Sequence, residues 1–407
     1  MRFNQFLGNI LASALEKQSS GDKYDVMLNS LLREKRLGKR DRIWVSDRFF
    51  FYLRHKLFFD EVSKNTGSLA KNIAMVFEDE PDGILAEKIE TLQKNGTYDK
   101  LFNESFPDFL ANKIRSLYGK ETFRWFNSKA KTILRTNLAA ISRDELSERL
   151  ANEGFANSPT PLSPAGIILE PSNKSLKNIE LFEKGSFEFQ DESSQLASLL
   201  VNKNTKTLLE PCAGGGGKSL SISSFFKNVE ITASDTRTHL FKEIKERATR
   251  AGANIKTAAF QDISDSFDTV FIDSPCSGSG VIRRNPGDRW SINEKMLKEL
   301  DSLQSELIRK FAAKVKKGGE LIYITCSFLE CENENIVNDF LNENRSFSLI
   351  PARDRLLENL GNGELLSEIL ESSLVTQFVH STLQLILDLH IHIIAGALVV
   401  SQRDNTF

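Results

Sequence analysis

The apolar residues of the chain follow one spacing in its first part and another in its last part. Up to about residue 125, Leu and Phe recur every three or four positions, and extended runs of Val, Ile or Thr are few. That is the spacing of helices that bury one face. We therefore predict an all-helical domain over residues 1–125.

Between residues 126 and 185 the pattern changes to short extended runs around one helix. KTILRTN and GIILE are typical of strands, and SRDELSERLANEG is typical of a helix. Ser142 and Glu145 have the spacing of a capping box, in which the first side chain caps the start of the helix. We predict a small α+β, RRM-like module over residues 126–185.

From residue 186 onward, short apolar strands alternate with helical stretches. The strand-like runs are TKTLLE, VEITAS, NIKTAAF, FDTVFID and GGELIYIT. This alternation predicts an α/β fold with a doubly wound sheet over residues 186–407, whose functional residues lie at the carboxyl ends of the strands. The apolar stretch 383–400 is interrupted by Asp388, His390 and His392. We expect edge strands there, and no membrane span.

Bulk composition narrows the function only slightly. The chain has 407 residues, 40% of them hydrophobic, and a formal net charge of −2. It has room for two or three domains and is not a globally basic nucleic-acid binder, so contact with phosphates depends on a local patch. The densest basic stretch, from Arg33 to Lys56, is interleaved with aromatic residues. It is either an RNA-facing surface or a solvated helix face whose aromatics belong to the core.

Four cysteines occur, at positions 212, 276, 326 and 331. No CxxC pair or His cluster accompanies them. We therefore predict neither a disulfide framework nor a metal site. A reducing, cytoplasmic location is expected.

A glycine-rich segment follows the first strand of the predicted sheet. Residues 211–219 read PCAGGGGKS, and glycines let a backbone turn sharply and approach a ligand. The next strand ends at Asp235, where folds that bind dinucleotide or adenosyl cofactors have an acid for the ribose hydroxyls. The segment also matches the phosphate-binding pattern GxxxxGK[ST] except at Cys212. A P-loop nucleoside triphosphatase is therefore an alternative.

Two of the predicted strands end close to a cysteine. Asp273 begins DSPCSGSG, which contains Cys276, and Cys326 stands in TCS after GGELIYIT. Strand ends of a doubly wound sheet lie side by side, so we expect the two thiols to share one pocket. A tight turn around a buried cysteine is the structural alternative for residues 273–280. A P-loop enzyme has no use for such a thiol pair, which favours methyl transfer.

These segments together resemble the Sun-related, NSUN-type RNA cytosine-C5 methyltransferases, including bacterial RsmB-like members that modify ribosomal RNA. The likeness extends upstream to FEFQDESSQ at 187–195 and RTN at 135–137. The helical region resembles a NusB-like RNA-binding extension more weakly. The resemblance implies a Rossmann-like class I methyltransferase domain that uses S-adenosylmethionine on RNA. It also implies a monomer that binds no membrane.

The resemblance assigns a role to each motif residue. Cytosine carbon 5 is a poor nucleophile, and a thiolate added to carbon 6 makes it reactive. Cys326 corresponds to that nucleophile and Cys276 to the thiol that assists breakdown of the covalent adduct. Asp273 is expected at the cytosine edge and Lys218 near the active site. The cofactor-binding set is Cys212, Ala213, Gly214, Gly215, Gly216, Gly217, Lys218, Asp235, Asp262 and Asp273.

The chain departs from the family pattern in two places. The family loop usually reads CAAPGGK, whereas residues 214 and 215 here are both Gly. The loss of a rigid proline predicts weaker cofactor binding. The tail at 390–400 lacks the DGFF-type strand of related enzymes. A catalytically impaired RNA-binding homologue is therefore a second alternative.

The segment after Cys276 contains Arg283, Arg284 and Trp290. It resembles the family's basic, proline- and tryptophan-containing segment. We expect these residues to contact phosphates and bases near the reacting cytosine, with ordinary surface arginines as the alternative.

Overall fold

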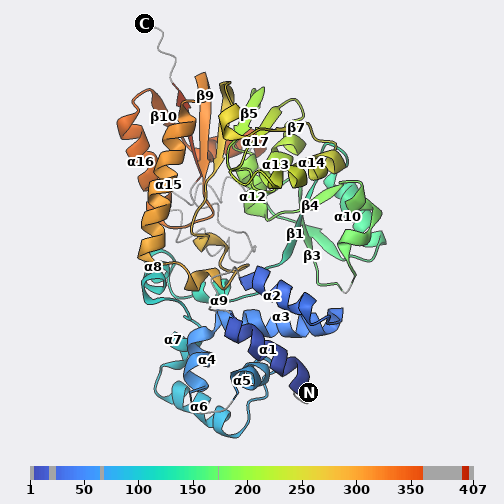
Figure 1. Ribbon diagram of the computed structural model, residues 1–407, viewed down its shortest axis with the longest axis vertical. Helices are drawn as coiled ribbons and strands as arrows, with labels where there is room; N and C mark the ends of the chain where they lie inside the picture. The colour runs from blue at the N-terminus through green and yellow to red at the C-terminus, as the bar shows by residue number, and fades with distance from the viewer. Residues whose placement is uncertain (1–3, 18–23, 65–67, 173, 361–396, 403–407) are drawn as a thin grey trace. The chain divides into compact units, whose positions relative to one another are not determined.

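The computed structural model describes residues 4–17, 24–64, 68–172, 174–360 and, as a strand, 397–402. The chain folds into two units (Figure 1). One comprises residues 1–130 and 281–292, and the other comprises residues 131–280 and 293–407. The division into three domains stays a prediction. That prediction did not include residues 281–292 in the helical domain, whereas the structure includes them in the first unit.

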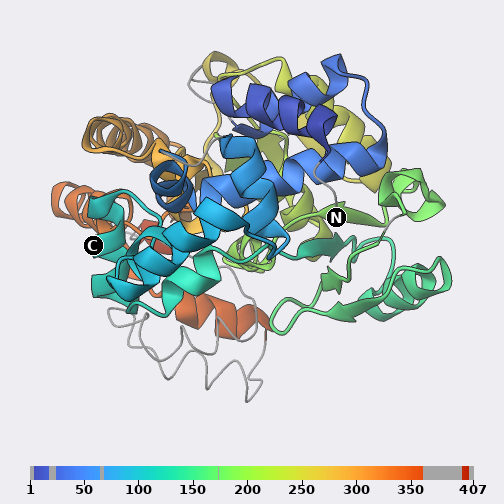
Figure 2. The same cartoon turned by 90° about the horizontal axis from the view of Figure 1, so that it is seen from below.

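The first unit is helical, as the spacing of its apolar residues predicts. Its described residues before position 127 contain no strand. Figures 1 and 2 show the helices, coloured from blue to teal, from two directions. They are α1 (Gln5–Lys17), α2 (Tyr24–Glu34), α3 (Lys39–Arg54), α4 (Lys56–Val62), α5 (Leu69–Phe77), α6 (Gly83–Lys94), α7 (Tyr98–Phe102), α8 (Asp108–Tyr118) and α9 (Thr122–Phe126).

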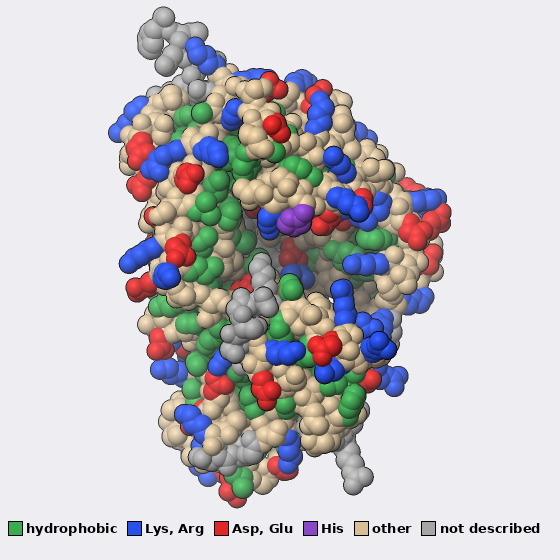
Figure 3. Space-filling model, viewed as in Figure 1, with side chains coloured by type: hydrophobic (Ala, Val, Ile, Leu, Met, Phe, Trp, Pro, Cys, Tyr) green, Lys and Arg blue, Asp and Glu red, His purple; other side chains and the backbone are tan. Residues whose placement is uncertain are grey.

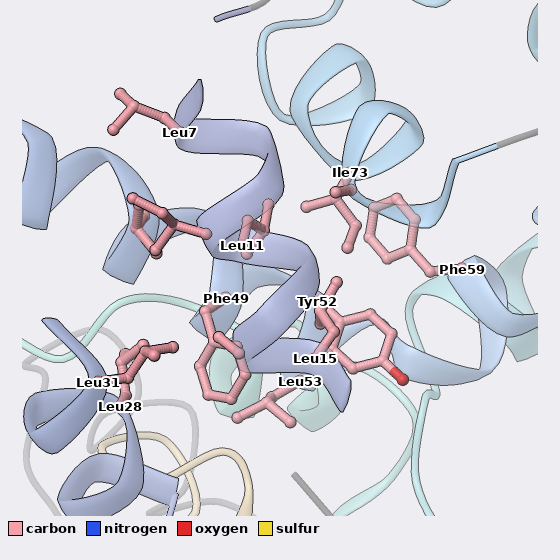
Figure 4. Packing of buried hydrophobic residues seen from close by; sticks show 14 of the residues in the cluster. Leu7, Leu11, Leu15, Leu28, Leu31, Phe49, Tyr52, Leu53, Phe59 and Ile73 are labelled. Atoms are coloured by element: carbon pink, nitrogen blue, oxygen red, sulfur yellow. The ribbon is translucent and has the colours of Figure 1, made fainter. Parts of the chain in front are cut away.

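The core of the helical unit is built around α1. Leu7, Leu11 and Leu15 recur every four residues and therefore lie on one face of this helix. Figure 4 shows this face packed against side chains from α2 to α5. Those labelled in the figure are Leu28, Leu31, Phe49, Tyr52, Leu53, Phe59 and Ile73.

The basic, aromatic-rich stretch divides between the core and the surface. Phe49 and Tyr52 are buried, and the Arg48 guanidinium lies 4.0 Å from the Trp44 ring while pairing with Glu78. The expectation that aromatic residues belong to the core is thus confirmed for Phe49 and Tyr52. The exposed cations precede them: Arg33, Lys35, Arg36, Lys39, Arg40 and Arg42.

Residues 281–292 pack within the helical unit through side chains that look polar in the sequence. The fully buried Arg289 guanidinium donates to the Asn127 side chain at 2.7 Å and the Ser105 carbonyl at 3.1 Å, and its centre lies 3.8 Å from the Phe106 ring centroid. The Trp290 indole donates to the Leu53 carbonyl at 2.9 Å. This segment is therefore an integral part of the helical core.

Arg283 is also buried within the helical unit. Its side chain is 3% exposed, lies over the Trp125 ring and donates to the Lys129 carbonyl at 3.1 Å. The prediction that Arg283 contacts RNA phosphates is wrong, because its donors face protein groups. Arg284 is exposed, and its contact with RNA stays a prediction.

The second unit begins with a small antiparallel sheet in the order β2-β3-β1-β4. Its strands are β1 (Thr132–Thr136), β2 (Asn157–Pro159), β3 (Gly166–Leu169) and β4 (Phe187–Phe189). The helix α10 (Arg143–Asn152) packs Leu146 and Leu150 against them. The predicted cap is confirmed, because the Ser142 hydroxyl accepts from the Glu145 amide at 3.2 Å.

The larger sheet has the strand order β10-β11-β9-β8-β5-β6-β7. Strands β5 (Thr207–Glu210), β6 (Glu230–Ala233), β7 (Ile255–Thr257), β8 (Phe267–Asp273) and β9 (Val315–Ile324) pair in parallel. This confirms the predicted doubly wound α/β sheet. β11 (Ala397–Gln402) runs antiparallel to both β9 and β10 (Phe347–Ile350).

The position of β11 corrects one expectation. An edge strand was predicted from the apolar tail, but β11 lies inside the sheet, between β9 and β10. Its backbone therefore pairs on both sides. The rest of the predicted apolar stretch, up to residue 396, lies outside the described residues.

Alternating side chains give the larger sheet two buried faces. Leu209, Val270 and Ile272 pack against α15 (Glu294–Ala312) and α16 (Glu334–Glu343). Leu208 and Phe271 point the other way, toward α12 (Glu192–Ser198), α13 (Gly217–Phe225) and α17 (Ala352–Leu360). The helix α14 (Leu240–Ala251) packs near β7 and α13. With helices on both sides, the carboxyl ends of the parallel strands are where functional groups can gather.

The described residues give two further properties, one of the helices and one of the surface. None of their helices is both long and apolar enough to cross a bilayer. On the face shown in Figure 3, basic and acidic side chains are intermixed, in line with the formal net charge of −2.

Arg289→Ala tests whether residues 281–292 stabilise the helical unit. The substitution leaves buried carbonyls without their donor, and we expect a loss of about 2–4 kcal/mol in the free energy of unfolding. Tryptophan fluorescence during urea unfolding reports on this unit, because Trp44, Trp125 and Trp290 all belong to it. The exposed Arg284→Ala is the control, and equal midpoints for the two variants would contradict the assignment.

Candidate active site

The carboxyl ends of β8 and β9 bring two thiols together. Asp273 and Ile324 are partners in the parallel pairing of these strands, and each strand continues into a loop that carries a cysteine. The sulfur atoms of Cys276 and Cys326 lie 2.9 Å apart. The expectation that the two thiols lie in one place is confirmed.

The two cysteines differ in exposure and in protonation. Cys326 is exposed, whereas Cys276 is half-buried. Their hydrogen bond lowers the pKa of Cys326, and the nearby Lys218 ammonium acts in the same direction, although burial and the Asp273 carboxylate oppose both. The same hydrogen bond, aided by burial, raises the pKa of Cys276 well above its ordinary value. The pair is therefore unequal: Cys326 is the more readily ionised thiol, and Cys276 is the one that keeps its proton more strongly.

The loops that carry the thiols are bonded directly to each other. The Gly280 amide donates to the Cys326 carbonyl at 2.9 Å, and the Cys326 amide donates to the Cys276 sulfur at 3.3 Å. A β-carbon at position 280 would lie 2.8 Å from the Cys326 carbonyl oxygen, closer than real contacts allow. Only glycine fits there, which explains the last residue of DSPCSGSG.

Lys218 and Asp273 form an ion pair beside the thiols. The ammonium group donates to the Asp273 carboxylate, and 17% of the Lys218 side chain is exposed. Burial alone would lower the pKa of Lys218, but the Asp273 carboxylate outweighs it and raises that pKa. The ammonium group lowers the pKa of the neighbouring Cys326, and the Asp273 carboxylate of the same ion pair opposes this effect.

The glycine loop turns from β5 toward α13 and closes on Asp235. The Gly214 amide donates to the Asp235 carboxylate at 2.9 Å, and φ is positive at Gly214 (54°) and Gly216 (76°). The carboxylate also accepts from the backbone and side chain of Arg237. Burial acts to raise the pKa of Asp235, but these hydrogen bonds outweigh it and lower that pKa. Sequence reasoning missed Arg237, which lies two residues beyond the acid.

Arg247 fixes the loop at the position where the family pattern has proline. Its guanidinium, on α14, donates to the Gly215 carbonyl at 2.5 Å and to Glu188 on β4 at 3.0 Å. A side chain at position 215 would press on Glu243 and Arg247, with a β-carbon 2.9 Å from the Glu243 carboxylate. The expected gain in backbone freedom is therefore offset by a side-chain clamp.

Glu210, at the end of β5, is a buried acid that the sequence motifs do not include. It is fully buried and accepts a hydrogen bond from the Ser219 hydroxyl. Burial raises its pKa to about 7, with a smaller contribution from Asp273. Nothing in the TKTLLE run distinguishes this glutamate from a surface residue at a strand end.

The other residues of the predicted cofactor set differ in exposure and in their hydrogen bonds. Cys212 is half-buried, and burial raises its pKa to about 12, so it is an inert thiol. The Ala213 amide donates to the Ser234 carbonyl at 2.9 Å. Asp262 is exposed at the end of the short helix η2 (Phe260–Asp262) that follows β7. Its contact with adenine stays a prediction.

Among the described residues, no group of three or more His, Cys, Asp and Glu side chains is arranged to hold a metal ion. The groups that meet at the strand ends are instead two thiols, an ion pair and a glycine loop beside an acid. This set can supply a sulfur nucleophile next to a cradle for a cofactor with hydroxyl groups.

Two known family models match parts of the chain. Residues 197–373 match the 16S rRNA methyltransferase RsmB/F family, and residues 106–174 match the ferredoxin-like domain of RsmF/B-like methyltransferases. Residues 197–373 are an RsmB/F-type methyltransferase domain. The resemblance found in the motifs is thereby confirmed.

A curated relative gives the same assignment over a longer region. The chain is 33% identical over 257 residues to a probable ribosomal RNA small subunit methyltransferase B from Bacillus subtilis. The match covers 60% of this chain and 57% of the Bacillus protein. The chain therefore spans little more than half the length of this relative.

Solved structures support the fold. The crystal structure of PH0851 aligns with a TM-score of 0.70 at 21% identity, covering 86% of this chain and 92% of that one. The structure of NSun6 from Pyrococcus horikoshii aligns with a TM-score of 0.54 at 19% identity, covering 61% of this chain and 90% of that one. The predicted Rossmann-like class I methyltransferase fold is confirmed. The P-loop alternative is wrong, because the glycine loop lies inside the RsmB/F-type domain.

Arg247→Ala tests whether the clamp holds the cofactor loop. Because the Gly215 carbonyl loses its donor, we expect S-adenosylmethionine to bind roughly five- to tenfold more weakly, on the order of 1 kcal/mol. Calorimetric titration measures this change. Lys245→Ala removes the same charge from an exposed position of α14 and is the control. An affinity of Arg247→Ala equal to that of the control would show that the loop needs no clamp.

Glu210→Gln tests the buried acid through the pH dependence of stability. The folded-state pKa of about 7 is above the ordinary value of 4.5, so the folded state favours the protonated acid. Stability from this group is present below pH 4.5 and is lost as the pH rises toward 7. We expect Glu210→Gln to remove this loss and to be more stable than the parent at pH 8, by about 3 kcal/mol.

Thermal unfolding followed by circular dichroism from pH 5 to 8 measures the difference between Glu210→Gln and the parent. Glu230→Gln, an exposed position on β6, should keep the parental pH dependence. A constant difference between Glu210→Gln and the parent over this range would contradict the raised pKa.

Proposed function

We propose that the chain is an S-adenosylmethionine-dependent methyltransferase that modifies carbon 5 of a cytosine in ribosomal RNA. The observation that carries the proposal is the thiol pair, with sulfur atoms 2.9 Å apart and a lowered pKa at the exposed Cys326. A relative named as a ribosomal RNA small subunit methyltransferase supports the substrate class. NSun6, solved with the S-adenosylmethionine analogue SFG, supports the cofactor.

The residues of the glycine loop fit S-adenosylmethionine. A β-carbon placed at Gly217 would have nothing within 4 Å, so the loop faces open space there. The Asp235 carboxylate, at the end of the adjacent strand, is an acceptor suited to ribose hydroxyls. Residues 212–218 would hold the methionine end, and Asp262 the adenine. When bound, the cofactor supplies an electrophilic methyl group on sulfur.

Cys326 begins the reaction by adding to the cytosine. Its thiolate attacks carbon 6, the new sulfur–carbon bond forms, and the carbon 5–carbon 6 double-bond electrons move toward the base. Asp273 would accept a hydrogen bond from the amino group at the cytosine edge, and the Lys218 ammonium beside it would offset the negative charge that develops on the ring. Lys218, paired with Asp273, keeps positive charge beside the thiolate. Carbon 5 then becomes a competent nucleophile for the methyl group.

Cys276 assists the breakdown of the methylated adduct. Water removes the proton from carbon 5, its electron pair restores the double bond, and the sulfur–carbon bond breaks toward Cys326. The Cys276 thiol, whose sulfur lies 2.9 Å from that of Cys326, would donate a hydrogen bond to the departing sulfur. Because this hydrogen bond lowers the pKa of Cys326, it also makes Cys326 a better leaving group.

The exposed cations of the helical unit are the proposed RNA contacts. Six of them lie between Arg33 and Arg42, and they give a local positive surface on a chain that is close to neutral overall. We propose that the chain acts as a monomer in the cytoplasm. The ferredoxin-like region and the helices together would select the RNA site.

The thiol variants test the proposal and the alternative of an inactive RNA-binding homologue. Cys326→Ala should form no covalent complex with RNA that contains 5-azacytidine, because no thiolate remains to attack carbon 6. Cys276→Ala should retain attack but release slowly, so adducts with ordinary RNA should accumulate. Denaturing gels separate the free protein from the cross-linked species.

Cys331→Ala, at a half-buried cysteine five residues after the nucleophile, is the matched control and should behave like the parent. Trapping of Cys326→Ala as efficiently as the parent would refute its role. Absence of trapping in the parent itself would favour the inactive homologue.

A further inference from the structure

Glu332 is a buried carboxylate that none of the motif assignments uses. It ends the short helix η5 (Glu330–Glu332), and its side chain is fully buried. Three hydrogen bonds reach its two oxygens, from the Ser277 amide at 2.8 Å, the Ser277 hydroxyl at 2.5 Å and the Gln304 side chain at 3.1 Å. Two of the three donors belong to the residue next to Cys276.

Gln304 adds a hydrogen bond on the other side of Cys276. Its side-chain nitrogen, on α15, donates to the Pro275 carbonyl at 2.8 Å as well as to Glu332. The peptide groups before and after Cys276 are therefore both held by one carboxylate and one amide.

We call Glu332 and Gln304, with their hydrogen bonds to Pro275 and Ser277, the Cys276 clamp. This clamp is bonded to β9, the strand that precedes the nucleophile. The Tyr323 hydroxyl, on β9, donates to the Glu332 carbonyl at 2.9 Å. Tyr323 precedes Cys326 by three positions, and Glu332 follows it by six. The position of Cys276 is thus set with reference to the backbone around Cys326.

The make-up of the clamp argues against a purely structural role. Within the described ranges, no lysine, arginine or histidine forms an ion pair with Glu332. A buried carboxylate among neutral donors costs more desolvation free energy than an apolar side chain of similar size. Its negative charge also adds to the causes that raise the pKa of Cys276, after the Cys326 hydrogen bond and burial. This contribution favours the protonated form of the Cys276 thiol.

We propose that Glu332, with Gln304, is the positioning residue that holds Cys276 for breakdown of the covalent adduct. The inference rests on the proposed methyltransferase function and adds residues that act on its last step through Cys276. Attack on carbon 6 depends on Cys326, whose sulfur the clamp does not touch. Release depends on the direction of the Cys276 thiol, which the clamp sets.

Glu332→Gln is the first test. The amide keeps the size of the side chain but has one acceptor oxygen, so it cannot serve all three donors. We expect single-turnover methyl transfer to persist and adduct release to slow by about tenfold or more. Accumulation of the adduct on ordinary RNA should therefore copy Cys276→Ala. Glu334→Gln, at an exposed position two residues on, is the matched control and should release at the parental rate.

The double variant separates positioning from general stabilisation. If Glu332 acts through Cys276, then Cys276→Ala with Glu332→Gln should release at the rate of Cys276→Ala alone. Multiplied effects in the double variant would overturn the inference. Gln304→Met, which keeps the length of the side chain but removes both hydrogen bonds, gives the same test if Glu332→Gln does not fold.

The remaining outcomes distinguish the inference from the proposed function. If Cys276→Ala accumulates adducts while Glu332→Gln and Gln304→Met release them normally, the clamp has no part in release. If neither Cys276→Ala nor the parent is ever trapped on RNA, the proposed function itself fails, and the inference with it.

Discussion

The hydrogen bond between the Cys276 and Cys326 sulfur atoms is the interaction on which the chemistry of this molecule depends. It makes two identical side chains unequal, because it lowers the pKa of the exposed Cys326 and raises the pKa of Cys276. Neither shift would occur in a cysteine that stood alone. The sheet, the glycine at position 280 and the clamp around Ser277 all serve to keep the two sulfur atoms at this separation.

The parallel pairing of β8 with β9 is what allows the hydrogen bond to form. Neighbouring parallel strands end at the same edge, so residues that follow Asp273 and Ile324 meet although they are about fifty positions apart in the chain. The same edge receives the Lys218 ammonium and the buried Glu210 from the β5 end.

Sequence reasoning found the residues whose placement follows from local rules. Strand alternation and the strand-end rule were enough to predict that Cys276 and Cys326 meet, and helical spacing was enough for the core around Leu11. Glu332 was missed because its partners, Ser277 and Gln304, come from segments that are far apart in the sequence, and only Ser277 belongs to a motif. The tail was assigned to an edge because strand order depends on pairing that is not local. Arg283 was expected at the RNA, since its partner is a backbone carbonyl that no sequence pattern reveals.

The assignment of residues 281–292 to the helical unit means that the chain passes between the two units three times, near positions 130, 280 and 292. Units joined by a single linker separate when that linker is cut, but here a cut near residue 130 leaves two covalent connections in place. A shortened chain that starts at residue 131 would carry Arg289 and Trp290 without the carbonyls that accept their hydrogen bonds. The helical unit therefore cannot be removed by cutting the chain at one point. Its removal would leave the segment that follows Cys276 without its buried hydrogen-bond partners.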